Sequence, residues 1–329
     1  MIKNIDESIL GVLRSNNDSS YVSSEELCDL AGVSRAAIWK HIEKLRLEGY
    51  EIEGLPHLGY RLVNIPDTLI PAEVKWRLRT KLLGSDVISY KKEDSKNNVL
   101  YDLAKKGLKE GAVVLAEEQT DGKGRQLRHW ASPAGGGIYM SCLLRPVITP
   151  NEIPIITIVA AVAVAKAIRE ISGLSAEIKW PNDILMNDRK VCGILTEMKA
   201  EHDRVEFVII GIGVNVNTRV KRLPKGASSL KEELRRAGRE DTVSRIALTK
   251  RILENLESEY FILNKSGPVS IIDEWKHLSA MLGSRIKVVL PTRTFEAQAH
   301  TIDRDGALMV RLDSGIIEKV SSGDVALIK

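Results

Sequence analysis

Cysteine is scarce in this chain of 329 residues, and so is any excess of charge. The three cysteines, Cys28, Cys142 and Cys192, are an odd number at wide spacing, which gives neither a disulfide framework nor a metal-binding knuckle. A reducing, cytoplasmic location is therefore expected. The net charge is only +4, so the overall charge is weak support for a nucleic-acid partner.

Long apolar segments and an amino-terminal targeting signal are also missing. The longest apolar run, 155–165, is interrupted by Thr157 and ends at Lys166. It falls short of the ~20 residues that a bilayer span needs, so we expect a buried helix and no membrane partner. The first residues, MIKNIDESIL, do not join a basic region to an apolar stretch, and no signal peptide is expected.

Residues 1–65 predict a winged helix-turn-helix domain. Apolar residues recur at helical spacing in 5–14, Ser23 can cap a second helix, and Ser34 begins a third that Gly49 closes. Two alternating runs then flank a Gly/Pro turn and predict a β-hairpin wing. The second and third helices are joined by a tight turn that contains Gly32, an arrangement typical of DNA-binding modules.

The third helix is expected to contact DNA through its outer side. Ile38, Ile42 and Leu45 share the inner side, and residues 34–49 hold four basic against two acidic residues. The whole segment 1–63 holds seven basic against ten acidic, so the alternative is a module that binds protein. The expected DNA-contacting residues are Ser23, Ser34, Arg35, Ala36, Ala37, Lys40, His41, Ile42 and Lys44.

The rest of the chain predicts an α+β protein with two further domains. Residues 66–83 contain two prolines and are predicted to be a linker. Strand and helix patterns alternate over 84–282, which indicates a catalytic-sized α/β domain. Residues 283–329 predict a small β domain from four short alternating runs, RIKVVL, TFEAQAHTID, ALMVRLD and IIEKVS.

Two motifs of the central domain suit phosphate chemistry. DGKGR, residues 121–125, alternates glycines with cations, and Arg128 adds another cation. KWPNDIL places Asn182 and Asp183 after Pro181, which ends a strand, and an aspartate near phosphates is a candidate Mg²⁺ ligand. The alternatives are a solvated basic loop and an ordinary Pro-Asn-Asp turn.

Two further motifs are apolar strands with embedded functional residues. RKVCGILTEM places Lys190 just before an apolar strand, where the alternative is a surface lysine. EFVIIGIGVNVN carries Gly211 and Gly213 at alternate positions. Glycine weakens a strand, so this pair indicates close approach of a ligand or of another backbone.

In combination, these segments resemble the biotin protein ligase family. The resemblance extends over essentially the whole chain, in the order S-K-N (95–97), EQTDGKGRQLRHW, SPAGGGIYMS, KWPNDIL, RKVCGILTEM and GIGVNVN. The winged helix matches the family's bifunctional ligase–repressor branch. Lipoate ligases share the core fold, but KWPND and the attached winged helix favour biotin.

The resemblance implies a class II synthetase-like catalytic core, a C-terminal SH3-like barrel and a two-step reaction. Biotin and Mg·ATP give biotinyl-5′-AMP, and a lysine of the biotin carboxyl carrier protein of acetyl-CoA carboxylase then accepts biotin. A biotinyl-AMP-bound homodimer would repress the biotin operon. The alternatives are a ligase whose winged helix no longer regulates and a regulator whose former enzyme domain only senses a ligand.

The resemblance also implies roles for individual residues. The biotin-binding set is Ser95, Lys96, Asn97, Gln119, Lys123, Gly124, Arg125, Lys190 and Gly193. The set for ATP and Mg²⁺ is Arg128, Trp130, Lys179, Asn182, Asp183 and Asn215, with Asp183 as the metal ligand. The catalytic set, which acts by positioning and charge neutralisation, is Lys190, Lys123, Arg125 and Arg128.

Four positions depart from the family pattern. Lys123 replaces the first arginine of the G-R-G-R-x-G-R loop, Leu127 a glycine and Asp121 an alanine. Lys96 stands where threonine is usual. Lysine keeps the charge of arginine but loses the bidentate fork, so these changes are expected to affect affinity more than reaction class.

Overall fold

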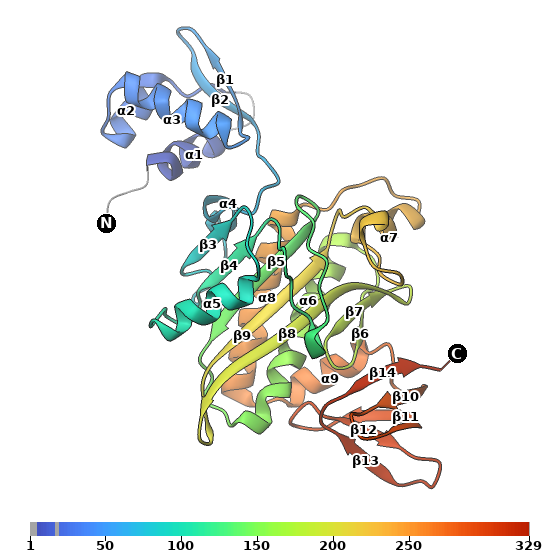
Figure 1. The fold of residues 1–329 in the computed structure, drawn as a ribbon. Helices are drawn as coiled ribbons and strands as arrows, with labels where there is room; N and C mark the ends of the chain where they lie inside the picture. The colour runs from blue at the N-terminus through green and yellow to red at the C-terminus, as the bar shows by residue number, and fades with distance from the viewer. Residues whose placement is uncertain (1–4, 17–19, 329) are drawn as a thin grey trace. The chain divides into compact units, whose positions relative to one another are not determined.

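The computed structural model describes residues 5–16 and 20–328 and divides the chain into two compact units, Met1–Asp67 and Thr68–Lys329 (Figure 1). The first unit has three helices and a two-stranded antiparallel sheet, as the winged-helix prediction requires. Its elements are α1 (Ile5–Ser15), α2 (Ser24–Ala31), α3 (Arg35–Leu47), β1 (Glu51–Leu55) and β2 (Gly59–Asn64).

The helix ends of the first unit follow the predicted capping pattern. The Ser23 hydroxyl accepts a hydrogen bond from the Glu26 amide at 3.1 Å, and the Ser34 hydroxyl accepts one from the Ala37 amide at 3.3 Å. Ile38, Ile42 and Leu45 of α3 are buried, which confirms the predicted inner side of that helix. The outer side of α3 is therefore left for solvent or a partner.

The second unit contains a seven-stranded mixed sheet with strand order β3-β4-β5-β9-β8-β7-β6. All its pairs are antiparallel except β3 with β4. The strands are β3 (Val87–Tyr90), β4 (Val113–Ala116), β5 (Gly137–Leu144), β6 (Glu177–Lys179), β7 (Asp183–Met186), β8 (Arg189–Glu201) and β9 (Arg204–Asn215).

Helices cover the two faces of this sheet unequally. One face packs against α6, which in turn contacts α8 and α9, while α5 covers only the part of the other face that lies over β4, β5 and β9. Part of that second face is thus free to form a site. The helices are α4 (Pro71–Lys75), α5 (Lys96–Lys105), α6 (Ile153–Ser172), α7 (Leu230–Arg236), α8 (Arg245–Ser266) and α9 (Val269–Leu278), with short 3₁₀ turns η1 (Arg125–Leu127), η2 (Pro150–Glu152) and η3 (Val220–Arg222).

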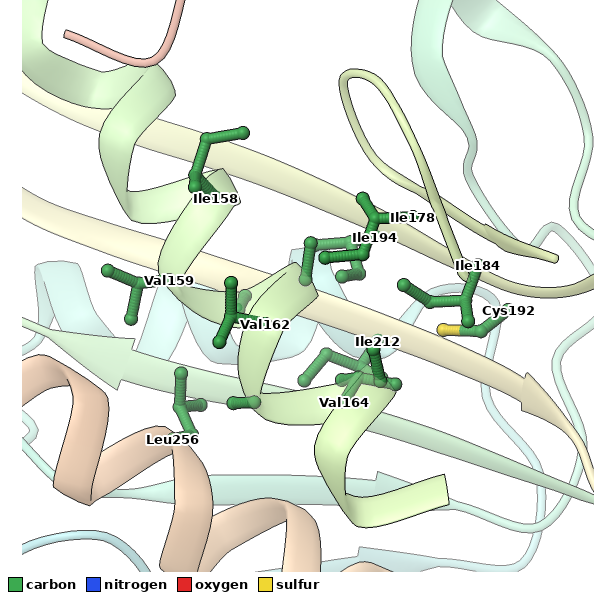
Figure 2. Packing of buried hydrophobic residues seen from close by; sticks show 14 of the residues in the cluster. Ile158, Val159, Val162, Val164, Ile178, Ile184, Cys192, Ile194, Ile212 and Leu256 are labelled. Carbon is green, nitrogen blue, oxygen red and sulfur yellow. The ribbon is translucent and has the colours of Figure 1, made fainter. Parts of the chain in front are cut away.

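The apolar helix α6 is the centre of the largest core cluster. Figure 2 shows Val162 of α6 with Ile194 and Ile212 of the sheet and Leu256 of α8 in this cluster. The expectation of a buried helix is confirmed, since the side chains of α6 are mostly buried. The helix nevertheless continues beyond the run seen in the sequence, and by length and composition alone Pro150–Ser172 could cross a membrane. Its burial against the sheet identifies it as a core helix.

The C-terminal part of the second unit is a five-stranded antiparallel sheet, and it has one strand more than predicted. Its order is β13-β12-β11-β10-β14. It is joined to the central sheet by a hydrogen bond of 2.9 Å from Trp180 Nε1 to the Gly306 carbonyl. The strands are β10 (Arg285–Val289), β11 (Thr294–Ile302), β12 (Leu308–Arg311), β13 (Ile317–Val320) and β14 (Asp324–Leu327).

The segment expected to be a linker, 66–83, belongs mostly to the second unit. Leu69, Val74 and Leu83 are buried in its main core cluster, so hydrophobic burial fixes a stretch that its prolines had marked as a connection. The Glu257 carboxylate of α8 anchors the same segment. It accepts hydrogen bonds from three successive amides, those of residues 81–83, at 2.6, 2.6 and 2.8 Å.

This anchor gives a test of stability. Replacing Glu257 with Ala should lower the free energy of unfolding by about 2–4 kcal/mol, because three amides lose a charged acceptor in a largely buried place. Glu257→Gln keeps one acceptor and should lose less. Urea denaturation measures both, and Ser258→Ala at the exposed next position of the same helix serves as control. Equal stability of wild type and Glu257→Ala would contradict the role of this carboxylate.

Candidate functional site

A cavity of about 420 Å³ lies on the open face of the seven-stranded sheet. Its walls come from the start of α5, the loop after β4, the facing strands β7, β8 and β9, the loop before α7 and one residue of β14. Most of the residues expected for ligand binding line it together, although they are spread over the whole central domain. They are Lys96, Lys123, Gly124, Arg125, Arg128, Trp130, Asn182, Asp183, Lys190, Gly193 and Asn215.

Glycines of β8 and β9 make the floor of this cavity. A Cβ atom on Gly213 would lie 2.5 Å from Trp130 Nε1, and one on Gly193 would lie 2.9 Å from Trp130 Cζ3. A Cβ atom on Gly211 would lie 2.3 Å from Asn97 Oδ1. The sequence predicted close approach of a ligand or of another backbone at the alternating glycines, whereas the groups that approach these three positions are side chains of the protein itself.

The lining carries a large excess of positive charge. Lys96, Lys123, Arg125, Arg128, Lys190 and Lys225 face only two carboxylates, Asp183 and Asp324. Like charges held this close repel one another, so the cavity favours a ligand that brings negative charge.

Lys190 lies at the centre of this charge cluster. Its Nζ atom is 2.7 Å from Asp183 Oδ1 and 5.3 Å from the centroid of the Trp130 ring. Asp183 Oδ1 is buried and, within the described residues, accepts no bond of hydrogen-bond geometry. The Trp130 Nε1 donor is also buried without a partner among those residues. Buried polar groups are normally satisfied, so the Trp130 Nε1 atom marks a place for a ligand contact, whereas Asp183 Oδ1 already has Lys190 beside it.

The arginines of the loop reach the C-terminal sheet. Arg125 donates to Asn182 Oδ1 at 3.2 Å and to the Gly323 carbonyl at 3.0 Å, and Arg128 is ion-paired with Asp324. Burial lowers the pKa of Arg125 from its ordinary value, although Asp324 and Asp183 oppose that shift. Both guanidinium groups are thus held at the cavity by residues outside their own loop.

The loop itself is folded back as a short hairpin. The Gly124 amide donates to the Arg128 carbonyl at 2.7 Å, and Lys123 Nζ donates to Asn98 Oδ1 at 2.6 Å. Leu127, where the family pattern has glycine, is fully exposed at φ 59°. This left-handed conformation is unfavourable for leucine by about 1–3 kcal/mol, which explains why glycine suits the position.

Lys96 is the least expected lining residue. It begins α5, only 6% of its surface is exposed, and its amide donates to Gln119 Oε1 at 3.1 Å. Burial lowers the pKa of its ammonium group to about 8, although Glu197 opposes that shift. A cation is therefore present here at neutral pH in a place that disfavours it.

Four of the expected ligand-binding residues do not line the cavity. Ser95 is buried at the start of α5, and Lys179 lies opposite Asp183 in the hairpin of β6 and β7. Asn97 donates to Glu197 at 2.6 Å, and Gln119 donates to Ser132 at 2.7 Å. The polar side-chain atoms of Asn97 and Gln119 thus already have protein partners.

Several lining residues were missed in the sequence. Asp324 gave no local signal, since it lies in a different sheet and far away in the chain. The loop before α7 looked like an ordinary connection. The missed residues are His129, Ala131, Ile194, Leu195, Leu223, Pro224, Lys225, Gly226, Ala227 and Asp324.

The first unit presents the outer side of α3 with two corrections to the expected DNA contacts. Ile42 is fully buried, so its assignment as a contact is wrong: it belongs to the inner side of the helix. His41 and Lys44 are turned toward α1, where Asp6 binds both and has its pKa lowered despite partial burial. Arg35, Ala36 and Lys40 are exposed, and Ala37 is half-buried.

An exposed tryptophan on α3 was not expected. Trp39 is 54% exposed and borders a groove between α3 and the wing, together with Arg35, Arg46 and His57. A groove with cations and an aromatic ring is a surface of the kind that contacts nucleic-acid backbones. Ser23 and Tyr60 line the same groove.

The cavity of the second unit is built for positioning anions. Its lining, among the residues that the structure describes, contains no serine, threonine or cysteine that could form an acyl intermediate. Its cations converge near Lys190 and Asp183. Such an arrangement stabilises charge as it develops on bound groups.

Comparisons with known proteins agree with this geometry. Residues 89–215 match the model of the biotin/lipoate A/B protein ligase family, 7–61 an HTH domain model, and 281–327 the model of the biotin protein ligase C-terminal domain. The bifunctional ligase/repressor BirA of Bacillus subtilis (strain 168) is 38% identical over 96% of each chain, and that of Escherichia coli (strain K12) is 29% identical over 94%. The biotin protein ligase of Aquifex aeolicus in complex with biotin and ATP matches 74% of this chain and 99% of its own, at 25% identity and a TM-score of 0.63.

The buried Lys96 predicts a pH-dependent stability. Its pKa is about 8 in the folded protein against an ordinary 10.5, so the unfolded chain holds the proton more tightly. The free-energy cost of burying the charged ammonium group is therefore fully present below pH 8 and disappears as the pH rises toward 10.5. Lys96→Met should therefore raise the free energy of unfolding at pH 7 by about 1–3 kcal/mol and much less at pH 10. Urea denaturation at both values checks this, with exposed Lys105→Met as control; a gain independent of pH would point to packing instead.

Proposed function

This chain belongs to the biotin protein ligase family, in its group of bifunctional ligase/repressors, and on this premise we propose that it makes biotinyl-5′-AMP and transfers biotin to a lysine of a biotin carboxyl carrier protein. The observation that carries the proposal is the meeting of Arg125, Arg128 and Lys190 in one glycine-floored cavity. The protein is also a repressor that acts through its winged helix. Biotin and ATP are its small-molecule ligands.

The first step joins two anions, and the cavity supplies the positive charge that this step needs. The biotin carboxylate attacks the α-phosphorus of ATP, the bond to the β-phosphate breaks, and pyrophosphate leaves. Lys190 would lie where carboxylate and phosphate meet, and Arg125 and Arg128 would neutralise the phosphates. Biotin would lie along Lys96, Lys123, Gly124 and Gly193. No nucleophile of the enzyme is needed, so catalysis is mainly positioning and electrostatic stabilisation.

The nucleotide would occupy the side of the cavity near Trp130, Asp183 and Asn215. Asn215 donates to the Ser228 carbonyl at 3.0 Å, and its Oδ1 atom is buried without a partner among the described residues. Mg²⁺ that arrives with ATP keeps most of its ligands from phosphate and water, so one carboxylate suffices. The Asp183 carboxylate, whose Oδ1 atom is ion-paired with Lys190 at 2.7 Å, would be that ligand, whereas both polar atoms of the Asn182 amide are bound within the protein. When bound, the ion would add charge neutralisation at the phosphates.

In the second step, the amine of the carrier lysine attacks the carbonyl carbon of the mixed anhydride and AMP leaves. Mass spectrometry of the carrier domain, incubated with the protein, biotin and Mg·ATP, tests the whole reaction. A mass gain of one biotin is expected. An unmodified carrier would contradict the proposal and favour the alternative hypothesis of a regulator whose former enzyme domain only senses a ligand.

Repression on a two-fold operator would require a homodimer. A single winged helix reads one short half-site, and dimers bind two. A strand edge is available for pairing: β7 pairs with β8 only over Arg189–Gly193, so from Leu195 to Glu201 β8 has β9 as its sole neighbour among the described strands. Such an edge can pair across a two-fold axis. We propose that adenylate favours this pairing and that the carrier protein competes for the same face.

The first prediction from this proposal concerns Lys190. Lys190→Ala should slow adenylate formation by about 100-fold or more, because a preorganised charge at the reacting centre is lost. Biotin-dependent exchange of pyrophosphate into ATP measures this step, and circular dichroism checks the fold. Lys109→Ala, at an exposed lysine beyond α5, is the control. Exchange at the wild-type rate in Lys190→Ala would refute the assignment.

The second prediction joins the two units. Biotin with ATP should raise the affinity of the protein for the biotin-operon promoter, and added carrier domain should lower it again. A gel-shift titration under the four conditions measures both effects. Affinity that is indifferent to adenylate, or that the carrier domain does not reduce, would remove the regulatory coupling and leave a ligase with a winged helix that no longer regulates.

A further inference from the structure

A strongly basic segment lies between β9 and α7. Residues 218–231 contain five cations and no acidic residue: Arg219, Lys221, Arg222, Lys225 and Lys231. All five are exposed. None of them is ion-paired in the part of the chain that the structure describes, whereas Arg235 and Arg236 of the neighbouring α7 are both paired with Glu232. The segment is thus an uncompensated patch of positive charge.

Hydrogen bonds hold this basic segment at the mouth of the cavity. The Lys190 amide donates to the Gly226 carbonyl at 3.2 Å, and the Ser228 amide donates to the Lys190 carbonyl at 2.9 Å. The side-chain amide of Asn215, at the end of β9, donates to the Ser228 carbonyl at 3.0 Å. Leu223 to Ala227 therefore line the cavity, and Arg219, Lys221 and Arg222 lie next to it in the chain but outside the lining.

We propose that the basic segment is the docking surface for an acidic face of the carrier domain that accepts biotin. This inference rests on the proposed function. The acceptor lysine has to enter the cavity to reach the adenylate, so the domain that carries it must come to rest against the mouth. An uncompensated cationic rim there attracts an acidic partner and raises its rate of association.

The nucleotide is a poorer match for these cations. Arg125, Arg128 and Lys190 already supply positive charge inside the cavity, whereas Arg219, Lys221 and Arg222 lie outside its lining. Arg219, Lys221 and Arg222 are exposed and unpaired, as expected for side chains that meet a partner from solution. The exposed Leu127 at the tip of the arginine loop offers an apolar contact to a domain that approaches from solution.

A charge-neutralising triple variant tests the proposal in the full-length protein. Arg219→Gln, Lys221→Gln and Arg222→Gln are combined, and Lys105→Gln, Lys106→Gln and Lys109→Gln form the matched control, which removes the same charge at the other end of α5. Each protein is assayed for pyrophosphate exchange, for aminolysis of its adenylate by hydroxylamine, and for transfer to an isolated carrier domain at low and high salt.

The expected result is selective. In the triple variant of residues 219, 221 and 222, kcat/KM for the carrier domain should fall about tenfold relative to the control variant at low salt. This difference between the two variants should shrink at high salt. Pyrophosphate exchange and hydroxylamine aminolysis should match the control. Unchanged transfer, or a loss that salt does not affect, would overturn the proposal. A parallel loss of pyrophosphate exchange would also overturn it, by assigning the segment to the nucleotide. Absence of exchange in the wild type would instead refute the proposed function.

Discussion

β8 and β9 pair from Cys192 opposite Val214 to Glu201 opposite Arg204, and this ladder decides which side chains can take part in the site. Side chains alternate across a sheet, so Ile194, Ile212 and Val214 face the core under α6. Gly193, Gly211 and Gly213 face the opposite way and leave the floor of the cavity. A shift of one residue in this register would exchange the two sets, burying the glycines and exposing the core.

The cavity gathers cations at the expense of stability. Lys96 is held in a place that lowers its pKa to about 8, and Leu127 is held in a left-handed conformation. Among the described residues that line it, Asp183 and Asp324 are the only carboxylates. Strain and unbalanced charge of this kind are typical of binding sites, where the ligand supplies what the protein lacks. Two anionic reactants would neutralise this excess of positive charge during adenylate formation.

The two units use positive charge differently. In the winged unit, Asp6 binds His41 and Lys44 of α3, so part of the helix's basic charge serves the fold. Arg35 and Lys40 stay exposed. In the second unit, Arg125, Arg128 and Lys190 of the cavity are ion-paired, whereas the cations of the basic segment have no ion pair among the described residues. These free cations are the ones that we propose to receive the carrier protein. Charge that is neutralised internally orders the structure, and charge that is left free selects partners.

The order of the motifs sufficed to identify the winged helix, the family and most of the cavity lining, because capping, periodicity and glycine placement are local properties of a sequence. Lys190, Arg125 and Gly193 were found in this way. Asp324 and the loop 223–227 could not be found, since they reach the cavity only through packing of distant segments. Asn97 and Gln119 do not line the cavity, and their internal hydrogen bonds could not be predicted, because a sequence does not show which polar atoms already have partners. The residue types at the site were therefore written in the sequence, and tertiary packing decided which of them face the ligand.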